Sequence, residues 1–335
     1  MYNIAILGGG VIGLTTAAVL QDRLSSTANI TVYADRLSPN TTGDVSAGLW
    51  TLFLIQDPDL DKILAWGRRT YEWVLQLWKA GHAGEAGIAL QPVKLLLNDG
   101  TQSKNASVVF GECPMAKVQV EEVNKALQVE FQAGVNYVTF TCQMTKYLPF
   151  LQRRFVQEGG KIVVRRVDSL NQLGEYDAIV NCSGMDASSL VGDDQMSPIR
   201  GQVIKVEAPW QFSTVLAGGS YVIVNEESTV LGGTAQIGDY GQDVRSSDSE
   251  KILRNCTKLV PSLKNTKVIA HMAGLRPGRT RVRLETEIKE IAGRRLPVIH
   301  NYGHGGSGVT LSYGCALSTL QLVKEALKIN LKSKM

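Results

Sequence analysis

The sequence predicts an α/β fold in which a Rossmann-like part is interleaved with a part built mainly on an antiparallel sheet. A strand, a glycine-rich turn, a helix and a second strand follow one another over residues 2–35. A second unit of strand, glycine-rich loop and helix occupies residues 296–327, and short apolar runs are grouped over residues 200–235. Strands that alternate with helices are typical of a parallel sheet, whereas grouped strands without helices are typical of an antiparallel sheet.

The composition is that of a folded protein with balanced charge. The chain has 335 residues, of which 44% are hydrophobic and 20% charged, so it can bury a sizeable core. Its 35 basic and 31 acidic residues are too evenly balanced for a nucleic-acid-binding protein, and no apolar run is long enough to cross a bilayer. The sequence shows no repeat or linker. We therefore expect residues 1–335 to form one compact unit with neither a nucleic-acid nor a membrane partner.

The cysteines predict thiols rather than cross-links. They are odd in number and scattered, and no two are spaced as CxxC. Such a pattern is typical of core residues in a reduced protein, and neither a disulfide framework nor a metal site is expected. The residues are Cys113, Cys142, Cys182, Cys256 and Cys315.

The N-terminal unit carries the spacing of a dinucleotide-binding loop. An apolar strand at 2–7 leads into a glycine turn and a helix, and a second apolar strand at 30–33 ends before Asp35. Glycines permit the tight turn and let a pyrophosphate approach the helix N-terminus, while the carboxylate accepts from a ribose hydroxyl. The turn glycines are Gly8, Gly10 and Gly13.

This fingerprint leaves NAD, NADP and FAD open as the ligand. Arg36, beside Asp35, would suit a 2′-phosphate. The following segment, SPNTTGDVSAGLW at 38–50, favours FAD because Thr41, Thr42 and a glycine turn could line an extended dinucleotide. An ordinary polar loop is the alternative reading of that segment.

The remaining elements are predicted from apolar spacing and turn residues. An amphipathic helix is expected at 60–80 and another at 145–159, with Pro149 near its first turn. The other expected elements are strands within 90–140, strands at 161–167 and 177–184, the antiparallel group at 200–235, a helix near 247–259, and a short strand at 267–270.

Three side chains could carry chemistry, and each has a structural alternative. Arg276 precedes Pro277, which stiffens the backbone, so its guanidinium could bind a carboxylate with two hydrogen bonds or could lie on the surface. Tyr221 begins a strand after two glycines and faces either a cleft or the sheet packing. His304 is either a base or a hydrogen-bonded loop residue. No hydrolase, zinc-protease or phosphate-loop motif is present, which leaves redox chemistry on a bound cofactor.

Seven segments, in order along nearly the whole chain, resemble the family of D-amino-acid oxidases and D-aspartate oxidases, which are peroxisomal FAD enzymes. The segments are GGGVIGLTTA, ADRLSPNTTGDVSAGLW, YLPFLQRR, IVNCSG, SPIRGQV, GLRPGRTRVRLE and HNYGHGGSG. The resemblance implies a Rossmann-like FAD-binding domain interleaved with a substrate domain. Their approximate parts are 1–55, 145–200 and 295–335 for FAD, and 56–144 and 201–294 for the substrate.

The resemblance also implies which residues contact FAD. They come from the glycine turn, the adenosine end, the loop after it, two later strand ends and the C-terminal glycine loop. These residues are Gly8, Gly9, Gly10, Gly13, Asp35, Arg36, Thr41, Thr42, Gly43, Ala47, Gly48, Leu49, Val167, Ser183, His304, Gly305, Gly306, Ser307, Gly308 and Val309.

By the same resemblance, Arg276 holds the carboxylate of a D-amino acid with help from Tyr221, and the backbone carbonyl of Gly306 receives the amine. Hydride transfer from Cα to flavin N5 and reoxidation by molecular oxygen give hydrogen peroxide. The imino acid then hydrolyses to a 2-oxo acid and ammonia.

The substrate side chain is a finer question. The short approach to Tyr221 resembles the D-aspartate branch, but Ala235 stands where that branch has an arginine, and the HGGSG loop matches the other branch better. Neutral D-amino acids are therefore slightly favoured, and acidic D-amino acids are the alternative. A protein that binds FAD without turnover is a more distant alternative, because the segment 99–118 matches the family poorly.

The C-terminal tripeptide Ser333-Lys334-Met335 resembles a peroxisomal import signal, and an ordinary polar tail is the alternative. It predicts binding to the peroxisomal import receptor and a location in the peroxisomal matrix. The sequence leaves a homodimer open as the assembly and does not decide the oligomeric state.

Overall fold

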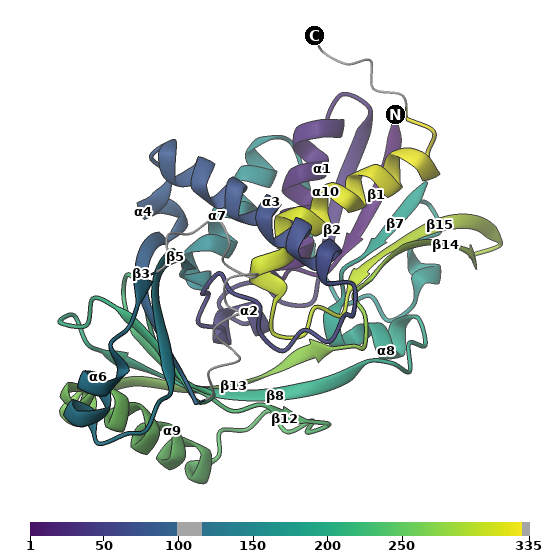
Figure 1. Ribbon diagram of the computed structural model, residues 1–335. Helices are drawn as coiled ribbons and strands as arrows, with labels where there is room; N and C mark the ends of the chain where they lie inside the picture. Colours follow the sequence, from purple (N-terminus) through teal and green to yellow (C-terminus); the bar gives the residue numbers. More distant parts are fainter. Residues whose placement is uncertain (99–115, 330–335) are drawn as a thin grey trace.

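The computed structural model describes residues 1–98 and 116–329. Cys113, most of the segment 99–118 and the C-terminal tripeptide lie outside the described residues. Within the described ranges, the structure is α/β with two sheets, which confirms the predicted fold class (Figure 1).

In the part of the chain that the structure describes, the first sheet has six strands and contains the predicted N-terminal unit. Its core strands are parallel, as expected for strands joined through helices, and one antiparallel strand forms an edge. In spatial order the strands are β14 (Arg283–Ile291), β15 (Arg294–Tyr302), β7 (Ala178–Asn181), β1 (Tyr2–Leu7), β2 (Ala28–Ala34) and β6 (Lys161–Val164).

Helices pack on this sheet and on one another. The N-terminal helix α1 contacts α7 and the C-terminal helix α10, and α10 also contacts α3 (Figure 1). The buried side chains between α1, α10 and the strands form one apolar cluster, which includes Ile6, Leu20 and Val323. The helices are α1 (Val11–Leu24), α3 (Leu60–Lys79), α7 (Met144–Gln157) and α10 (Gly308–Ala326).

Among the described residues, the second sheet has nine strands and is antiparallel except for the β3–β9 pair. It contains the predicted antiparallel group. The strands along its path are β12 (Gln236–Ile237), β8 (Ser197–Glu207), β11 (Thr229–Gly232), β10 (Ser220–Val224), β9 (Thr214–Ala217), β3 (Ile88–Leu97), β5 (Ala133–Cys142) and β4 (Ala116–Lys117), and β13 (Lys267–Gly278) pairs with β8.

Shorter helices complete the described residues. Below the second sheet in Figure 1 lie α6 and α9, of which α9 contacts β8, β10 and β11. The remaining helices are α2 (Thr42–Val45), α4 (Ala83–Ala86), α6 (Val120–Leu127), α8 (Ala187–Leu190) and α9 (Ser246–Leu259), with 3-10 turns at Leu170–Leu173, Gly184–Asp186 and Pro261–Asn265.

The predicted length of the strand at 267–270 is wrong, because the strand β13 is longer. It extends through Arg276 to Gly278 because β8 pairs with it along its whole length, from Lys267 opposite Glu207 to Gly278 opposite Ser197. Among the described strands β13 has a partner on one side only, and an edge strand tolerates Pro277, which has no N–H to donate.

Three other details differ from expectation. The strand β14 was not predicted; it forms a hairpin with β15 in the first sheet, although 283–291 falls in the range expected for the substrate part. The range 90–140, expected to hold strands, also holds the amphipathic helix α6. Pro149 lies in the second turn of α7 rather than the first, because the helix begins at Met144.

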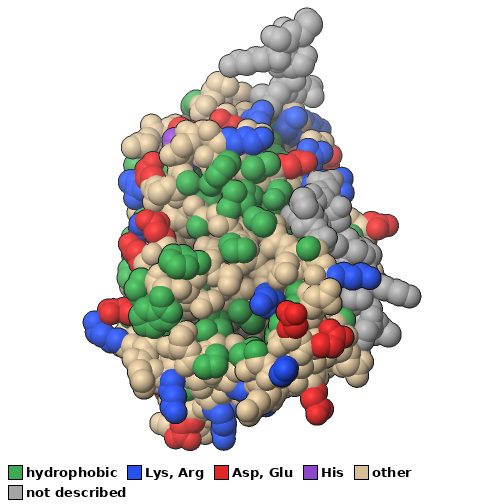
Figure 2. All heavy atoms as spheres, turned by 60° about the vertical axis from the view of Figure 1, so that its left-hand side comes forward, with side chains coloured by type: hydrophobic (Ala, Val, Ile, Leu, Met, Phe, Trp, Pro, Cys, Tyr) green, Lys and Arg blue, Asp and Glu red, His purple; other side chains and the backbone are tan. Residues whose placement is uncertain are grey.

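The surface is charged but mixed. On the face seen in Figure 2, basic and acidic side chains are interspersed around patches of hydrophobic ones. This pattern agrees with the small net charge of +4. Among the described helices, none is long and apolar enough to span a bilayer.

Candidate active site

A cavity of about 1170 Å³ runs between the two sheets. Its lining includes residues that directly follow four parallel strands: Gly8 after β1, Asp35 after β2, Arg165 after β6 and Cys182 after β7. The carboxyl ends of parallel strands meet at one edge of a sheet, which is where α/β proteins bind ligands. The other side of the cavity is lined by residues of the nine-stranded sheet, among them Tyr221 on β10.

The glycine turn after β1 shapes this edge. Gly8 has a φ of +116°, and a Cβ there would lie 2.4 Å from the carbonyl oxygen of Cys182. A Cβ on Gly13 would lie 2.0 Å from the carbonyl oxygen of Gly8, so this glycine lets α1 pack against the turn. A Cβ on Gly10, by contrast, would meet nothing within 4 Å, and Gly10 lines the cavity. Gly8 and Gly13 therefore permit the turn, and Gly10 leaves room beside it.

One end of the cavity holds a carboxylate between arginines. Asp35 lies 3.4 Å from Arg36 Nε and 3.8 Å from Arg166 Nη1, and Arg165 lies 4.9 Å above the ring of Tyr33. Neither Arg165 nor Arg166 was among the residues predicted from the sequence. Their signal was present, because they follow β6 just as Asp35 follows β2, and the two strands are parallel neighbours.

The loop after Asp35 continues the lining. Thr41 and Asp44 form a reciprocal capping box at the start of α2, and Lys205 donates to the Asp44 carbonyl at 3.0 Å. Gly48 has a φ of +69°, and a Cβ there would lie 1.9 Å from the carbonyl oxygen of Cys142. The buried hydroxyl oxygen of Ser46 has no hydrogen-bond partner among the described residues.

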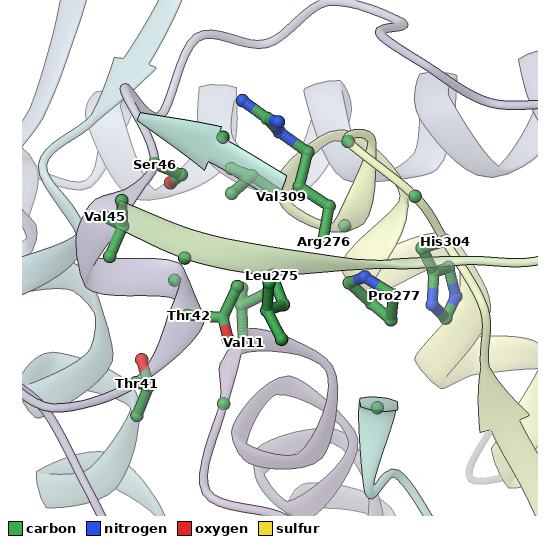
Figure 3. A pocket seen from close by; sticks show the side chains of 18 of the residues that line it. Val11, Thr41, Thr42, Val45, Ser46, Leu275, Arg276, Pro277, His304 and Val309 are labelled. Carbon is green, nitrogen blue, oxygen red and sulfur yellow. The ribbon is translucent and has the colours of Figure 1, made fainter. Parts of the chain in front are cut away.

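The opposite end of the cavity brings Arg276 and Tyr221 together. Figure 3 shows Arg276 and Leu275 leaving opposite sides of β13, as successive residues of a strand do. The guanidinium lies over Gly201 of β8, where a Cβ would be 2.2 Å from Nη1. The ring of Tyr221 lies over Gly232 of β11, where a Cβ would be 2.1 Å from the ring. Two glycines on neighbouring strands thus make space for the two side chains.

Burial changes the electrostatics of this pair. Arg276 donates to the carbonyl of Thr234 at 3.1 Å, and no acidic side chain of the described residues lies within ion-pair distance. Burial lowers the pKa of Arg276, and the neighbouring Tyr221 opposes part of that effect. Burial also raises the pKa of Tyr221, so the phenol keeps its proton and can donate. Arg276 and Tyr221 thus offer hydrogen-bond donors to an anion, and no described residue supplies that anion.

The loop before α10 closes the cavity beside this pair. A Cβ on Gly305 would lie 2.2 Å from the carbonyl oxygen of Leu54, and one on Gly306 would lie 2.6 Å from that of Phe53. The side chain of His304 is 1% exposed, and its Nε2 has no partner among the described residues. Burial lowers the pKa of His304 to about 3, so the imidazole is neutral near pH 7. In this state it carries no charge with which to pair with an anion.

Most of the residues predicted to touch the cofactor or substrate surround this one cavity. The lining residues are Gly8, Gly9, Gly10, Asp35, Arg36, Thr41, Thr42, Gly43, Ala47, Gly48, Leu49, Val167, Ser183, Tyr221, Arg276, His304, Gly305, Gly306, Gly308 and Val309. Gly13 and Ser307 do not line it. Gly13 is a packing residue, and the hydroxyl of Ser307 is hydrogen-bonded to the backbone of Phe53. Phe53 also lines the cavity. It was not predicted from the sequence, because no spacing signal marks it.

A family model described as FAD dependent oxidoreductase matches residues 3–322. The chain belongs to this family. The human D-aspartate oxidase is 35% identical over 96% of this chain and 95% of its own length. The D-amino-acid oxidase of Rubrobacter xylanophilus is 36% identical over 96% of both chains, and that of Dugesia ryukyuensis is 32% identical over 99% and 100%. The predicted resemblance is confirmed, and these relatives include both of its branches.

Solved structures show the same fold in more distant proteins. Glycine oxidase from Bacillus cereus superposes with a TM-score of 0.76 at 17% identity, covering 98% of this chain and 96% of its own. Iminodiacetate oxidase from Chelativorans sp. superposes with a TM-score of 0.77 at 17% identity, covering 96% and 95%. At such identities the likeness concerns the fold alone.

The cavity of this FAD-dependent oxidoreductase fits its cofactor. A volume of about 1170 Å³ exceeds that of most pockets for a single small ligand, so it has room for a dinucleotide and a substrate. The backbone is open at Gly10 and Gly184, where a Cβ would meet no protein atom within 4 Å. The unpartnered atoms Ser46 Oγ and His304 Nε2 are polar groups that a ligand can satisfy. The family match identifies the cofactor as FAD, a choice that the glycine fingerprint alone left open, and the cavity has the room and the polar groups to hold it.

Proposed function

We propose that the protein catalyses the oxidative deamination of D-amino acids, with neutral D-amino acids preferred, to 2-oxo acids, ammonia and hydrogen peroxide. One observation carries the proposal. At the end of the cavity away from Asp35, the buried guanidinium of Arg276 lies beside the Tyr221 phenol with no acidic partner among the described residues. A buried cation without a counter-ion is costly, and a substrate carboxylate supplies that counter-ion.

The residues of the chain bind and orient the substrate. Arg276 can hold the carboxylate through two parallel hydrogen bonds, and Tyr221 can donate one more. Gly306, which lines the same end, offers a backbone carbonyl for the substrate amine, as the family resemblance implies. When FAD is bound, it supplies the acceptor for the hydride of Cα and the route of electrons to oxygen. Holding the reacting groups in one geometry is the main contribution of the protein, because an amine can lose its proton to solvent.

The chemistry of the cavity wall favours neutral side chains. Four lining residues are cationic. Arg36, Arg165 and Arg166 lie at the end of the cavity that holds Asp35. Arg276 lies at the other end, beside Tyr221, which we call the substrate end. The wall near Arg276 includes Phe53 and Tyr221, which are in edge-to-face contact. Ala235 is exposed and does not line the cavity. A second substrate carboxylate would find no cation among the described residues of that wall and would lose its hydration.

D-Aspartate oxidation is the competing proposal within the same family. It is favoured by the 35% identity to the human D-aspartate oxidase over nearly the full length. The D-amino-acid oxidases are 36% and 32% identical, so the identities alone do not choose between the two activities.

Flavin absorbance under anaerobic conditions tests both proposals. The purified protein is mixed without oxygen with D-alanine and, separately, with D-aspartate, and L-alanine serves as the control. We expect D-alanine to bleach the flavin about 5- to 150-fold faster than D-aspartate at equal concentration, because an unpaired buried carboxylate costs about 1–3 kcal/mol. Faster bleaching by D-aspartate would reverse the substrate preference. A flavin that no D-amino acid bleaches would instead mean a protein that binds FAD without turnover.

We also propose that Ser333-Lys334-Met335 directs the protein to the peroxisome. The support is the likeness of this tripeptide to the C-terminal import signal, together with an oxidase product, hydrogen peroxide, that peroxisomes handle. We expect a fluorescent protein fused before residue 1 to collect in punctate organelles that carry a peroxisomal marker. Deletion of the last three residues should disperse the fluorescence, and a tripeptide ending in leucine should restore it. Punctate fluorescence after the deletion would show that this tail is not the signal.

A further inference from the structure

The segment Thr51–Phe53 is a wall of the cavity that belongs to no sheet. Trp50, just before it, is still tied to the nine-stranded sheet, because its N–H donates to the Phe140 carbonyl at 2.8 Å. Beyond Trp50 the chain leaves that sheet, and Thr51, Leu52 and Phe53 all line the cavity. Backbone groups that leave a sheet need other partners when they are partly buried.

Two hydroxyls at the start of α10, those of the N-cap residue Ser307 and of Thr310, supply those partners. The N–H of Thr51 donates to Thr310 Oγ1 at 3.1 Å, and the Thr310 hydroxyl donates back to the Thr51 carbonyl at 2.6 Å. The N–H of Phe53 donates to Ser307 Oγ at 2.9 Å, and the Ser307 hydroxyl donates back to the Phe53 carbonyl at 3.0 Å. Each hydroxyl thus pairs with both backbone groups of one residue, as a neighbouring strand would.

The spacing of the two elements makes this pairing possible. Ser307 and Thr310 are three residues apart, so they lie on one face of the first turn of α10. Thr51 and Phe53 are two residues apart, so their backbone groups point to the same side of an extended segment. Ser307 stands at the N-cap position, yet its side chain makes no capping hydrogen bond. A serine at that position usually accepts from the helix backbone, and here its hydroxyl is used for Phe53 instead.

The held segment places Phe53 against the carboxylate-binding pair. The guanidinium carbon of Arg276 lies 5.5 Å from the centre of the Phe53 ring. The rings of Phe53 and Tyr221 are 6.4 Å apart and nearly perpendicular, at 85°. A Cβ on Gly306 would lie 2.7 Å from Cδ1 of Phe53. Any movement of Phe53 therefore changes the space next to the site where a substrate carboxylate binds.

We propose that Ser307 and Thr310 are positioning residues of the substrate pocket, which hold Phe53 at a set distance from Arg276 and so select among substrate side chains. The inference rests on the proposed function, because it takes Arg276 as the carboxylate-binding residue. Neither hydroxyl needs to touch the substrate. Ser307 is fully buried and outside the cavity lining, and Thr310 is 2% exposed.

Acetate and benzoate, two carboxylates without an amine, distinguish a change in the position of Phe53 from a change in carboxylate binding at Arg276. Acetate can occupy the Arg276 end but has no side chain that reaches the wall, whereas benzoate places a ring next to Phe53. The ratio of their dissociation constants therefore depends on the position of the Phe53 ring. A change that affects Arg276 alone alters both dissociation constants and leaves their ratio nearly the same. Neither compound can be deaminated, so the measurement does not depend on turnover.

The test uses holoenzyme variants and titration of the flavin absorbance with each carboxylate. Ser307→Ala removes both hydrogen bonds to Phe53, and Thr310→Val removes both bonds to Thr51 at nearly constant volume. Thr310→Ser keeps the hydroxyl. Ser312→Ala is the matched control, because Ser312 is a buried serine of the same helix whose hydroxyl donates within the helix, to Val309.

We expect Ser307→Ala and Thr310→Val to change the benzoate-to-acetate ratio by about fivefold or more, and to change KM for D-amino acids more than kcat. Thr310→Ser and Ser312→Ala should leave the ratio within about twofold of the wild type. Equal ratios in Ser307→Ala and Ser312→Ala, even with a lower melting temperature in the former, would reduce the hydroxyls to a structural role and overturn the inference. A wild type that binds neither carboxylate would overturn the proposed function itself, and the positioning role with it.

Discussion

Replacing Arg276 by alanine should lower kcat/KM for D-alanine by about 10²–10³-fold. The guanidinium is the cation of the substrate end among the described residues, so its loss leaves the substrate carboxylate without a charged partner in a cavity of low polarity. Removing one partner of a buried, hydrogen-bonded charge pair costs about 2–5 kcal/mol. Steady-state kinetics on the purified variant, with oxygen consumption as the signal, measures the loss.

The variant Arg276→Lys separates charge from geometry. Lysine restores the charge but not the two parallel donors, so we expect it to recover a part of the lost activity and no more. The FAD content of both variants should equal that of the wild type, because Arg276 lies at the end of the cavity away from Asp35. Alanine at this position with wild-type kcat/KM would show that the carboxylate binds elsewhere.

Replacing Gly10 by alanine should weaken FAD binding by about 10–100-fold while leaving the apoprotein as stable as the wild type. A Cβ at Gly10 would meet no protein atom within 4 Å, so the protein alone has room for it. The same Cβ points into space that the pyrophosphate needs, and overpacking of that kind costs about 1–3 kcal/mol. Titration of the apoprotein with FAD and a melting curve without FAD measure the two quantities.

Alanine substitutions at two other glycines serve as comparisons for Gly10→Ala. Gly8→Ala should lower the melting temperature of the apoprotein as well, because the residue has a φ of +116° and its Cβ would lie 2.4 Å from the Cys182 carbonyl oxygen. Gly84→Ala is the matched control: its Cβ also meets nothing within 4 Å, but it lies on α4, outside the cavity lining. FAD affinity unchanged in Gly10→Ala would mean that the pyrophosphate does not approach the turn.

Features set by short stretches of sequence were predicted well. The unit β1–α1–β2 requires only apolar periodicity and three spaced glycines within 35 residues, and it occurs as expected. The same holds for α3, whose amphipathic spacing places it at Leu60–Lys79 against an expected 60–80. Where an element depends on a distant partner, prediction was poorer. The length of β13 follows from its pairing with β8, which begins 70 residues earlier in the chain, at Ser197 against Lys267.

The candidate site divides in the same way. The dinucleotide turn and the carboxylate at Asp35 were found from spacing, since their geometry is local. For Arg276, local sequence offered a carboxylate-binding residue and a surface residue as equal readings, and the family resemblance, not the spacing, favoured the first. Gly201 and Gly232 gave no local signal at all, because each makes room for a side chain that belongs to a different strand.

By itself, the sequence determined the fold class, because apolar periodicity and turn residues are local, and the family, because seven ordered segments carry its motifs. The cofactor and most of the residues around the cavity followed from that resemblance. Only the tertiary structure decided that Arg276 lies beside Tyr221 without an acidic partner among the described residues, and that the Ser307 hydroxyl holds Phe53 instead of capping α10. Such relations join residues that are tens to hundreds of positions apart. They are set by strand register and helix packing, and no pattern along the chain encodes them locally.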